Sequence, residues 1–427
     1  MSREWLWTVT GLKRDRAKVL ATGFPMLTML MFGVFLQTCN NPTPTSPSPG
    51  TWLVLLCKAS DAPQEPHPKS FYQAAFAKNQ ADLLFSYFDA ASLHAVDVSN
   101  TEVYGWFPMG VKTADIAPSV RNNSTSPNRS QTVIDCQNPA LGGILATGIN
   151  VDPSKYAGVI TVINVPVDSG QADTHSVVVS TQLESEVGFV VHEMLHVLGL
   201  ANHSWLTSPD ISADHAWAHG GDVEYNDCWD IMSYRTCDFV FTTVRGLQGP
   251  ELEEAYRRIL GWLPGNRVKS IPLYPAGTNT ITLAPVSDPT QSGFLLAQIE
   301  VENQGYYVVE YRQNTGFDRA IPFNAVVIRE LRNDGITYLV QRQNGLTGWQ
   351  QGEMFTDSAN NISISVNSIA PGAATITINT TFSTTPPGVG GWCGDEYKGQ
   401  VLACPAATTC KSRLAGGLQS VDWFCLP

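Results

Sequence analysis

One segment near the middle of the chain, HEMLHVLGLANH at residues 192–203, carries three histidines and a glutamate at a spacing suited to metal chemistry. Its pattern is H-E-x-x-H-x-x-G-x-x-H. On a helix His192 and His196 share a face, so both imidazoles can reach one ion, and Glu193 lies beside them. Gly199 tolerates the left-handed backbone that ends a helix and turns the chain back. That turn would bring His203 to the same ion.

Three neutral imidazoles with one open coordination position are typical of a catalytic zinc site, because a structural site closes the fourth position with Cys or His. Water would take the open position, and Zn²⁺ lowers the pKa of such a water to about 7. Glu193 would accept the proton and pass it to a leaving amine. We therefore expect hydrolysis, most naturally of peptide bonds, with a protein or peptide as substrate.

A helix has to present these residues, and the sequence predicts one from about residue 181 to 198. The segment TQLE at 181–184 is a capping-box pattern. Apolar side chains then recur at helical spacing. They are Leu183, Val187, Val190, Val191, Met194, Val197 and Leu198.

A second segment, CWDIMSY at residues 228–234, follows downstream. The histidine motif together with this methionine resembles the metzincin metalloproteases, in which a methionine turn lies beneath three zinc-binding histidines. The resemblance implies that Met232 is that methionine. It also implies that Tyr234, two residues later, approaches the zinc and stabilises the oxyanion. Ordinary core packing is the alternative for both side chains.

Three further segments look like the secreted proteases related to gametolysin and to immune inhibitor A. They are TWLVLLCKASD (51–61), RRILGWLP (257–264) and YYVVEYRQNTGFDRAIP (306–322). The resemblance covers residues 51–382 and implies a catalytic domain followed by a β-sandwich. The immune-inhibitor branch usually has aspartate at the third ligand position, so His203 places the zinc site nearer the gametolysin branch.

Composition narrows the class of protein. Of 427 residues, 43% are hydrophobic and 15% charged, which disfavours a disordered chain. With 26 basic against 38 acidic residues the net charge is −12, which would repel a phosphate backbone, so we expect no nucleic-acid partner. The 35 glycines and 27 prolines favour turn-rich β structure.

The N-terminus carries an export or anchoring signal. Basic residues precede an apolar run at 19–36, so residues 1–40 are either a signal peptide or a membrane anchor, and a lipid on Cys39 is a third alternative. Residues 41–50, NPTPTSPSPG, form a Pro-rich linker. We expect a secreted or cell-surface location.

The rest of the chain divides into three parts of an α+β protein. Buried strands at 51–57 and 158–165 and helical spacing at 71–93 open a metzincin-like catalytic domain, residues 51–265, with a twisted mixed sheet beside the zinc-site helix. Residues 266–382 predict a β-sandwich. Its seven expected strands are 279–283, 294–300, 306–312, 325–331, 337–340, 362–366 and 374–378. Residues 383–391 are a linker.

Residues 392–427 form a small Cys-rich module, too short to be stable by its core alone. Nine cysteines in an exported chain predict disulfides and one leftover thiol. Cys228 and Cys237 are expected to pair, and the other pairings stay open. The module's aromatic residues either stack on polysaccharide rings or form its core. They are Trp392, Tyr397, Trp423 and Phe424.

Two weaker patterns remain in the sequence. The loop before Met232 holds acids and histidines that suit either a Ca²⁺ site or a solvated loop. They are Asp210, Asp214, His215, His219, Asp222 and Asp227. Glu310 and Arg312 share one face of a strand and predict a structural ion pair at the domain junction. The rival to the enzyme is a non-enzymatic adhesion or wall-binding protein that keeps the metzincin fold as scaffold.

Overall fold

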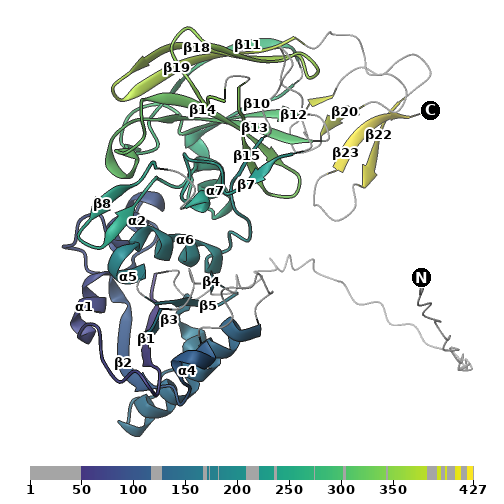
Figure 1. Ribbon diagram of the computed structural model, residues 1–427. Helices are drawn as coiled ribbons and strands as arrows, with labels where there is room; N and C mark the ends of the chain where they lie inside the picture. Colours follow the sequence, from purple (N-terminus) through teal and green to yellow (C-terminus); the bar gives the residue numbers. More distant parts are fainter. Residues whose placement is uncertain are drawn as a thin grey trace, which may run out of the picture. The chain divides into compact units, whose positions relative to one another are not determined.

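The computed structural model describes most of the chain after residue 49 (Figure 1). The described ranges are 50–116, 127–166, 171–172, 174–180, 182–207, 221–234, 238–273, 275–301, 304–342, 345–381 and the backbone of four strands between 392 and 426. Contacts separate residues 1–45 from a compact unit, 46–427. The expected signal or anchor at 1–40 lies outside the described residues. Within them, no helix has the length and apolar character to cross a membrane.

The fold is α+β, and its first sheet has five strands in the order β2-β1-β3-β5-β4. Four strands are parallel, and only the edge strand β4 runs antiparallel to its neighbour. Continuous apolar runs suit strands that are covered on both faces. The strands are β1 (Leu53–Lys58), β2 (Glu102–Pro108), β3 (Val159–Ile163), β4 (Gln171–Ala172) and β5 (Ser176–Val179). The mixed sheet and the strands predicted at 51–57 and 158–165 are confirmed.

Side chains of β1 alternate between two cores, one on each face of this sheet. Leu53 and Leu55 join the core beneath helix α4 (Pro127–Ala146). Val54 and Leu56 join the opposite core, which contains α2 (Leu84–Ala91) and α6 (Val187–Val197). Smaller helices of this part are α1 (Lys69–Ala74), α3 (Thr113–Ile116), α5 (Gln182–Ser185) and α7 (Glu254–Ile259).

Two helix expectations need correction. The helical spacing at 71–93 is split into α1 and α2, with Asp82 between them at a φ of 61°, a left-handed conformation that no continuous α-helix contains. The longest helix, α4, was not predicted. It contains Pro139 and the pair Gly142 and Gly143, and proline and glycine are both poor helix formers. Packing against β1 and β2 stabilises it instead.

Beyond this part, two sheets face each other across one core (Figure 1). One has the order β10-β12-β13-β14-β15-β6-β7, with β16 pairing β14, and the other has the order β11-β19-β18-β17. Their strands are β6 (Trp205–Leu206), β7 (Val223–Glu224), β10 (Val268–Ile271), β11 (Gly277–Leu283), β12 (Leu296–Val301), β13 (Gly305–Arg312), β14 (Ala325–Arg332), β15 (Thr337–Leu339), β16 (Gly348–Trp349), β17 (Met354–Asp357), β18 (Ile362–Ala370) and β19 (Ala373–Thr380). All seven strands expected after residue 264 are confirmed.

The larger sheet crosses the domain boundary that the sequence places near residue 265. Strand β6 pairs in parallel with β15, and β7 pairs with β6. Both strands come from the part of the chain that carries the histidine motif. That part and the two-sheet part are therefore joined by backbone hydrogen bonds.

A small sheet with the order β21-β20-β23-β22 lies in the Cys-rich module. Its strands are β20 (Trp392–Asp395), β21 (Gln400–Val401), β22 (Thr409–Leu414) and β23 (Val421–Leu426). Trp392 is in register with Phe424. Tyr397 and the side chains of this module lie outside what the structure describes, so its polysaccharide contact and its disulfides stay predictions.

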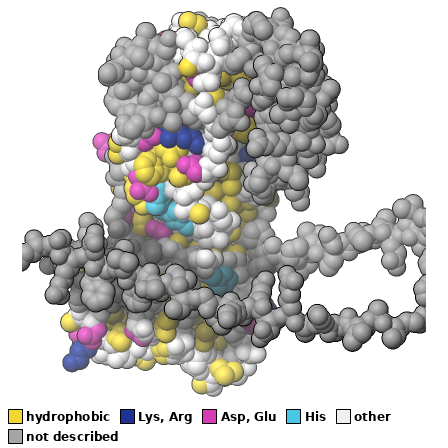
Figure 2. Space-filling model, turned by 90° about the vertical axis from the view of Figure 1, so that its right-hand side faces the viewer, with side chains coloured by type: hydrophobic (Ala, Val, Ile, Leu, Met, Phe, Trp, Pro, Cys, Tyr) yellow, Lys and Arg dark blue, Asp and Glu magenta, His cyan; other side chains and the backbone are white. Residues whose placement is uncertain are grey.

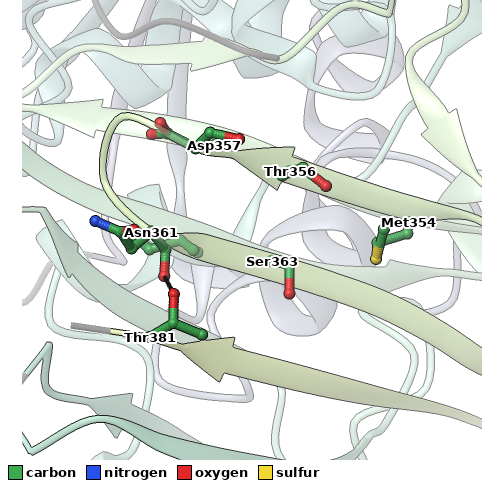
Figure 3. Close-up of a pocket in the computed structure, with 8 residues that line it drawn as sticks. Met354, Thr356, Asp357, Asn361, Ser363 and Thr381 are labelled. Carbon is green, nitrogen blue, oxygen red and sulfur yellow. Dashed lines mark hydrogen bonds between the residues drawn. The ribbon is translucent and has the colours of Figure 1, made fainter. Parts of the chain in front are cut away.

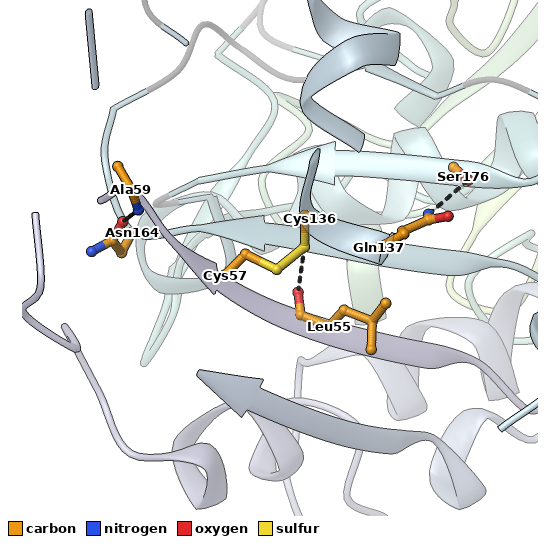
Figure 4. The surroundings of a disulfide bond; sticks show 7 residues. All are labelled: Leu55, Cys57, Ala59, Cys136, Gln137, Asn164 and Ser176. Carbon is orange, nitrogen blue, oxygen red and sulfur yellow. Dashed lines mark hydrogen bonds between the residues drawn. A yellow bond between two sulfur atoms is a disulfide. The ribbon is translucent and has the colours of Figure 1, made fainter. Parts of the chain in front are cut away.

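A disulfide joins Cys57 on β1 to Cys136 on α4 (Figure 4). Both residues are fully buried. Nearby, Gln137 of α4 donates to Ser176 of β5, which ties the helix to a second strand. Cys228 is also disulfide-bonded, while its expected partner Cys237 lies outside the described residues. The disulfide therefore fixes the helix that the sequence failed to predict.

Replacing both Cys57 and Cys136 by Ala should lower the free energy of unfolding by about 4 kcal/mol. The reason is that the bond closes a loop with a sequence separation of 79 in the unfolded chain. Urea denaturation of the double variant and of the wild type measures the difference. Equal stability of the two proteins, with the wild-type bond verified by mass spectrometry, would contradict the expectation.

A buried network of charged side chains lies where the two parts of the chain meet. Arg312 and Glu310 form the ion pair predicted from the sequence, with nitrogen and oxygen 3.0 Å apart. Among the described residues of the network, the carboxylates outnumber the guanidinium groups. The acids are Asp227, Asp230, Glu251, Glu253, Glu254, Glu310 and Asp318, and the bases are Arg257, Arg312 and Arg329.

This network contains carboxylates of two kinds, those whose pKa is raised and those whose pKa is lowered. Burial raises the pKa of Glu251 and of Glu254 to about 7, although Arg257 pairs with both. Burial also raises the pKa of Asp230 to about 6. At Glu310 burial acts in the same direction, but Arg329 and Arg312 outweigh it and lower the pKa to about 2. Part of the network is therefore protonated near neutral pH.

Glu254→Gln should gain stability relative to the wild type as pH rises. The wild-type carboxyl titrates near 4.5 when unfolded and at about 7 when folded, so its contribution is greatest at low pH and is lost as pH rises through 7. The variant cannot titrate there. Urea unfolding of both proteins at pH 5 and pH 8 should therefore shift the difference by about 3 kcal/mol in favour of the variant. Parallel pH curves would contradict this.

Candidate metal centre

Helix α6 carries the histidine motif and begins later than the sequence predicts. Instead of one helix from 181 to 198, a short helix α5 (Gln182–Ser185) is separated from α6 by Glu186, whose φ of −149° and ψ of 61° are not helical. Glu186 forms a β-bridge with Gly246, the first residue of β9 (Gly246–Gln248), and β9 pairs with β8 (Phe241–Thr243). This tertiary contact replaces the predicted continuous helix, and Thr181 of the capping box lies outside the described residues.

The end of α6 is formed as the sequence predicts. Gly199 has a φ of 120°, within the left-handed region that favours glycine. The N–H of Gly199 donates to the backbone carbonyl of His196, and the N–H of Leu200 donates to the backbone carbonyl of Leu195. The turn also places the Leu200 carbonyl 2.6 Å from Nδ1 of His196. One turn therefore ends the helix and fixes the orientation of a histidine on it.

The three histidines converge at their Nε2 atoms. His196 Nε2 lies 3.1 Å from His192 Nε2 and 3.1 Å from His203 Nε2. Two imidazole nitrogens on one tetrahedral zinc, each about 2.0–2.1 Å from the metal, would be separated by roughly 3.3 Å. The observed separations fit such an ion, and the sequence prediction that the three residues come together is confirmed.

The Nδ1 atom of each imidazole faces a different oxygen acceptor. The Nδ1 atom of His192 lies 3.0 Å from the Ile231 carbonyl, and that of His196 faces the Leu200 carbonyl. Nδ1 of His203 lies 2.6 Å from the Glu224 carboxylate. These oxygens can only accept, so each Nδ1 carries the proton and each Nε2 has a lone pair free to coordinate a metal.

Burial keeps two of these imidazoles neutral. Burial lowers the pKa of His196 to about 4. It also lowers the pKa of His192 well below its usual value, and the neighbouring His196 acts on His192 in the same direction. A metal ligand has to be unprotonated, so the site is ready to bind at neutral pH. Figure 2 shows a group of histidine side chains at the surface of one face, with acidic and apolar side chains around it.

Met232 lies in the 3-10 helix η4 (Ile231–Ser233), which packs against α6. The Asp230 carboxylate accepts from the N–H of Met232 at 3.0 Å and so starts the turn. Met232 is fully buried in the core that also contains the apolar face of α6. Because the preceding residue, Ile231, supplies the carbonyl that lies 3.0 Å from Nδ1 of His192, this turn orients a histidine of the candidate centre.

The two residues predicted to act on substrate occupy different surroundings. Glu193 lies on α6 next to His192 and is 6% exposed. Tyr234 is 5% exposed, and its hydroxyl donates to the Leu247 carbonyl at 3.4 Å. Its ring packs 6.2 Å from that of Phe189.

The tyrosine hydroxyl found beside the histidines belongs to Tyr225, 2.9 Å from Nε2 of His203. Sequence reasoning missed both Tyr225 and Glu224. Neither residue belongs to the motif, and their only signal was membership of the acidic loop between His203 and Met232.

Two acids of that loop, named above as possible calcium ligands, form ion pairs with arginines instead. Asp222 pairs with Arg332 at 2.8 Å, and the buried Asp227 pairs with Arg329. Asp210, Asp214, His215 and His219 lie outside the described residues. Within the part of the chain that is described, the three histidines are the one group of such side chains placed to hold a metal ion.

A hollow of about 320 Å³ lies on the smaller sheet of the two-sheet part (Figure 3). Its lining includes Met354, Thr356, Ser363 and Thr381. The one carboxylate in the lining, Asp357, is buried and accepts from Tyr307 at 2.7 Å. Apart from this engaged carboxylate the hollow offers hydroxyl groups, an amide and a thioether, and its lining contains no histidine.

Comparison with known proteins adds no family to these observations, since no protein-family model matches the chain and no curated protein matches its sequence.

Glu224→Ala should weaken zinc binding by about 10–100-fold, because the carboxylate fixes the tautomer and direction of His203. Isothermal titration with Zn²⁺ should give one ion per wild-type chain, and His196→Ala should abolish binding. Asp89→Ala is the matched control, because Asp89 pairs with the surface His94 at 3.0 Å, outside this site. Equal affinities for the Glu224→Ala protein and the wild type would contradict the assigned role.

Proposed function

We propose that this chain is an exported zinc-dependent endopeptidase that hydrolyses peptide bonds of extracellular proteins. The observation that carries the proposal is the convergence of the Nε2 atoms of His192, His196 and His203 within one coordination sphere, next to Glu193 on the same helix. Three imidazoles favour zinc over calcium or magnesium, which prefer oxygen ligands. The methionine turn beneath His192 supports a metzincin-like catalytic domain.

Zinc bound by the three histidines would lower the pKa of a water at the open position to about 7 and polarise a substrate carbonyl. Glu193 would accept the proton of that water on its carboxylate and transfer it to the nitrogen of the leaving amine. Glu193 follows His192 directly on α6, and it does not belong to the group of donor atoms formed by the three histidines, so it is not a fourth ligand of a tetrahedral site.

The edge strand β4 offers a place for the substrate. It runs antiparallel to β5 and contacts α6, which carries the histidines. An extended peptide can add to such an edge by main-chain hydrogen bonds, and pockets for its side chains then set the cleavage preference. We therefore infer that the substrate binds in an extended conformation along β4.

Export is supported by the cysteines. The Cys57–Cys136 disulfide and the bonded Cys228 require an oxidising compartment to persist. A secreted or cell-surface enzyme, with residues 1–40 as signal peptide or anchor, is consistent with them. Anchorage through residues 19–36 or through a lipid on Cys39 belongs to the same proposal.

Glu193→Gln should lower the hydrolysis of casein by about 10²–10⁴-fold, because it removes the general base and keeps the shape of the side chain. A zinc chelator should abolish the wild-type activity, and added Zn²⁺ should restore it. Zinc content measured on the variant is the control, since the three ligands are intact.

Equal activity of the Glu193→Gln protein and the wild type would contradict the proposal. A protein that binds zinc but cleaves nothing would favour the adhesion alternative, because a scaffold needs the histidines but not Glu193.

A further inference from the structure

Two consecutive residues contact the two ring nitrogens of His203. Glu224 accepts from Nδ1 at 2.6 Å, and the hydroxyl of Tyr225 lies 2.9 Å from Nε2. The Tyr225 ring also lies over the imidazole, with ring centroids 4.0 Å apart and planes tilted by 33°. Tyr225 is more distant from His192, with a centroid separation of 6.4 Å.

This double contact needs an unusual backbone. Consecutive side chains of a strand point to opposite faces, so a regular continuation of β7 would carry Tyr225 away from His203. Tyr225 instead has a φ of 62°, in the left-handed region of the backbone that residues other than glycine rarely adopt. Its N–H donates to the carbonyl of Ser204, the residue after His203, at 3.1 Å. Backbone conformations of this kind concentrate at functional sites.

The hydroxyl of Tyr225 and a metal ion would use the same atom of His203. Nδ1 carries the proton donated to Glu224, so Nε2 has the only lone pair of the ring. The phenol oxygen lies 2.9 Å from Nε2, within hydrogen-bond distance of the atom that a metal ion would use. Once an ion occupies the lone pair, the phenol oxygen is left beside it, at a separation from Nε2 close to the roughly 3.3 Å between two ligand atoms on a tetrahedral zinc.

We propose that Tyr225 is a catalytic residue whose phenol oxygen is a donor to the metal in addition to the three histidines and the water, in a place that substrate can open by displacing it. The inference rests on the proposed function of the histidine site. The oxygen binds the metal as phenolate, after the phenol has released its proton to solvent, and it takes up a proton again when it is displaced. The phenol is still tethered over His203 and can then donate its O–H to the oxyanion that develops on the scissile carbonyl. The resemblance gives this role to Tyr234, whose hydroxyl faces the Leu247 carbonyl instead.

The direct test is the visible spectrum of the full-length protein reconstituted with Cu²⁺ at one ion per chain, because a phenolate oxygen bound to Cu²⁺ gives a charge-transfer band in the visible range and imidazole ligands do not. The wild type and Tyr234→Phe should show the band. Tyr225→Phe should lose it while still binding one Cu²⁺. The Phe variant keeps the ring that packs over His203, and Tyr234→Phe is the matched control.

The wild-type spectrum alone can overturn the proposal, whatever the folding of the variants, if the band is missing. A band that persists in Tyr225→Phe, or loss of metal binding by that variant, would also overturn it. On casein, Tyr225→Phe should lower kcat by about 10²–10³-fold with little change in KM, as expected for the loss of one oxyanion donor. Since the copper spectrum needs no catalysis, it separates this inference from failure of the proposed peptidase activity.

Discussion

The site depends on three imidazole lone pairs that face one point. The Nε2 atoms of neighbouring histidines are 3.1 Å apart, and each has its lone pair directed inward because Nδ1 carries the proton. The three lone pairs carry like partial charges and therefore repel one another. A divalent cation at the centre attracts all three and so replaces this repulsion by attraction. The surrounding structure therefore has to hold the rings in place, and it does so by hydrogen bonds from three separate segments: the turn at Leu200, the η4 turn and the end of β7.

The two-sheet part of the chain contributes to this rigidity. Oδ2 of Asp230 accepts from the N–H of Met232, which caps η4, and from the hydroxyl of Ser204 at 2.5 Å. Oδ1 of Asp230 accepts from the N–H of Glu253 at 2.8 Å. Asp227, three residues earlier, pairs with Arg329 on β14. Strand β6, which includes Trp205 just after Ser204, pairs with β15. The position of His203 is thereby linked to the core of the two sheets, so the second part supports the candidate centre.

Sequence reasoning located the centre because its signals are local. The spacing of His192, His196 and His203 and the glycine at 199 are set by helix geometry and by one backbone conformation, and both can be predicted from a dozen residues. The seven strands were equally predictable from their alternating or continuous apolar runs. What failed depends on distant contacts. The break at Glu186 follows from its bridge to Gly246, and α4 is stabilised by the sheet although its own residues are poor helix formers. Glu224 and Tyr225 reach His203 only through a left-handed turn that no sequence pattern predicts.

The central claim is a zinc ion on three imidazoles with one position open to a light oxygen donor. X-ray absorption at the zinc edge of the wild-type protein, loaded with one Zn²⁺ per chain, measures this directly. We expect three imidazole nitrogens at about 2.0–2.1 Å and an oxygen in the same shell. A sulfur scatterer at about 2.3 Å, a fourth imidazole, or fewer than three imidazoles in that shell would contradict it.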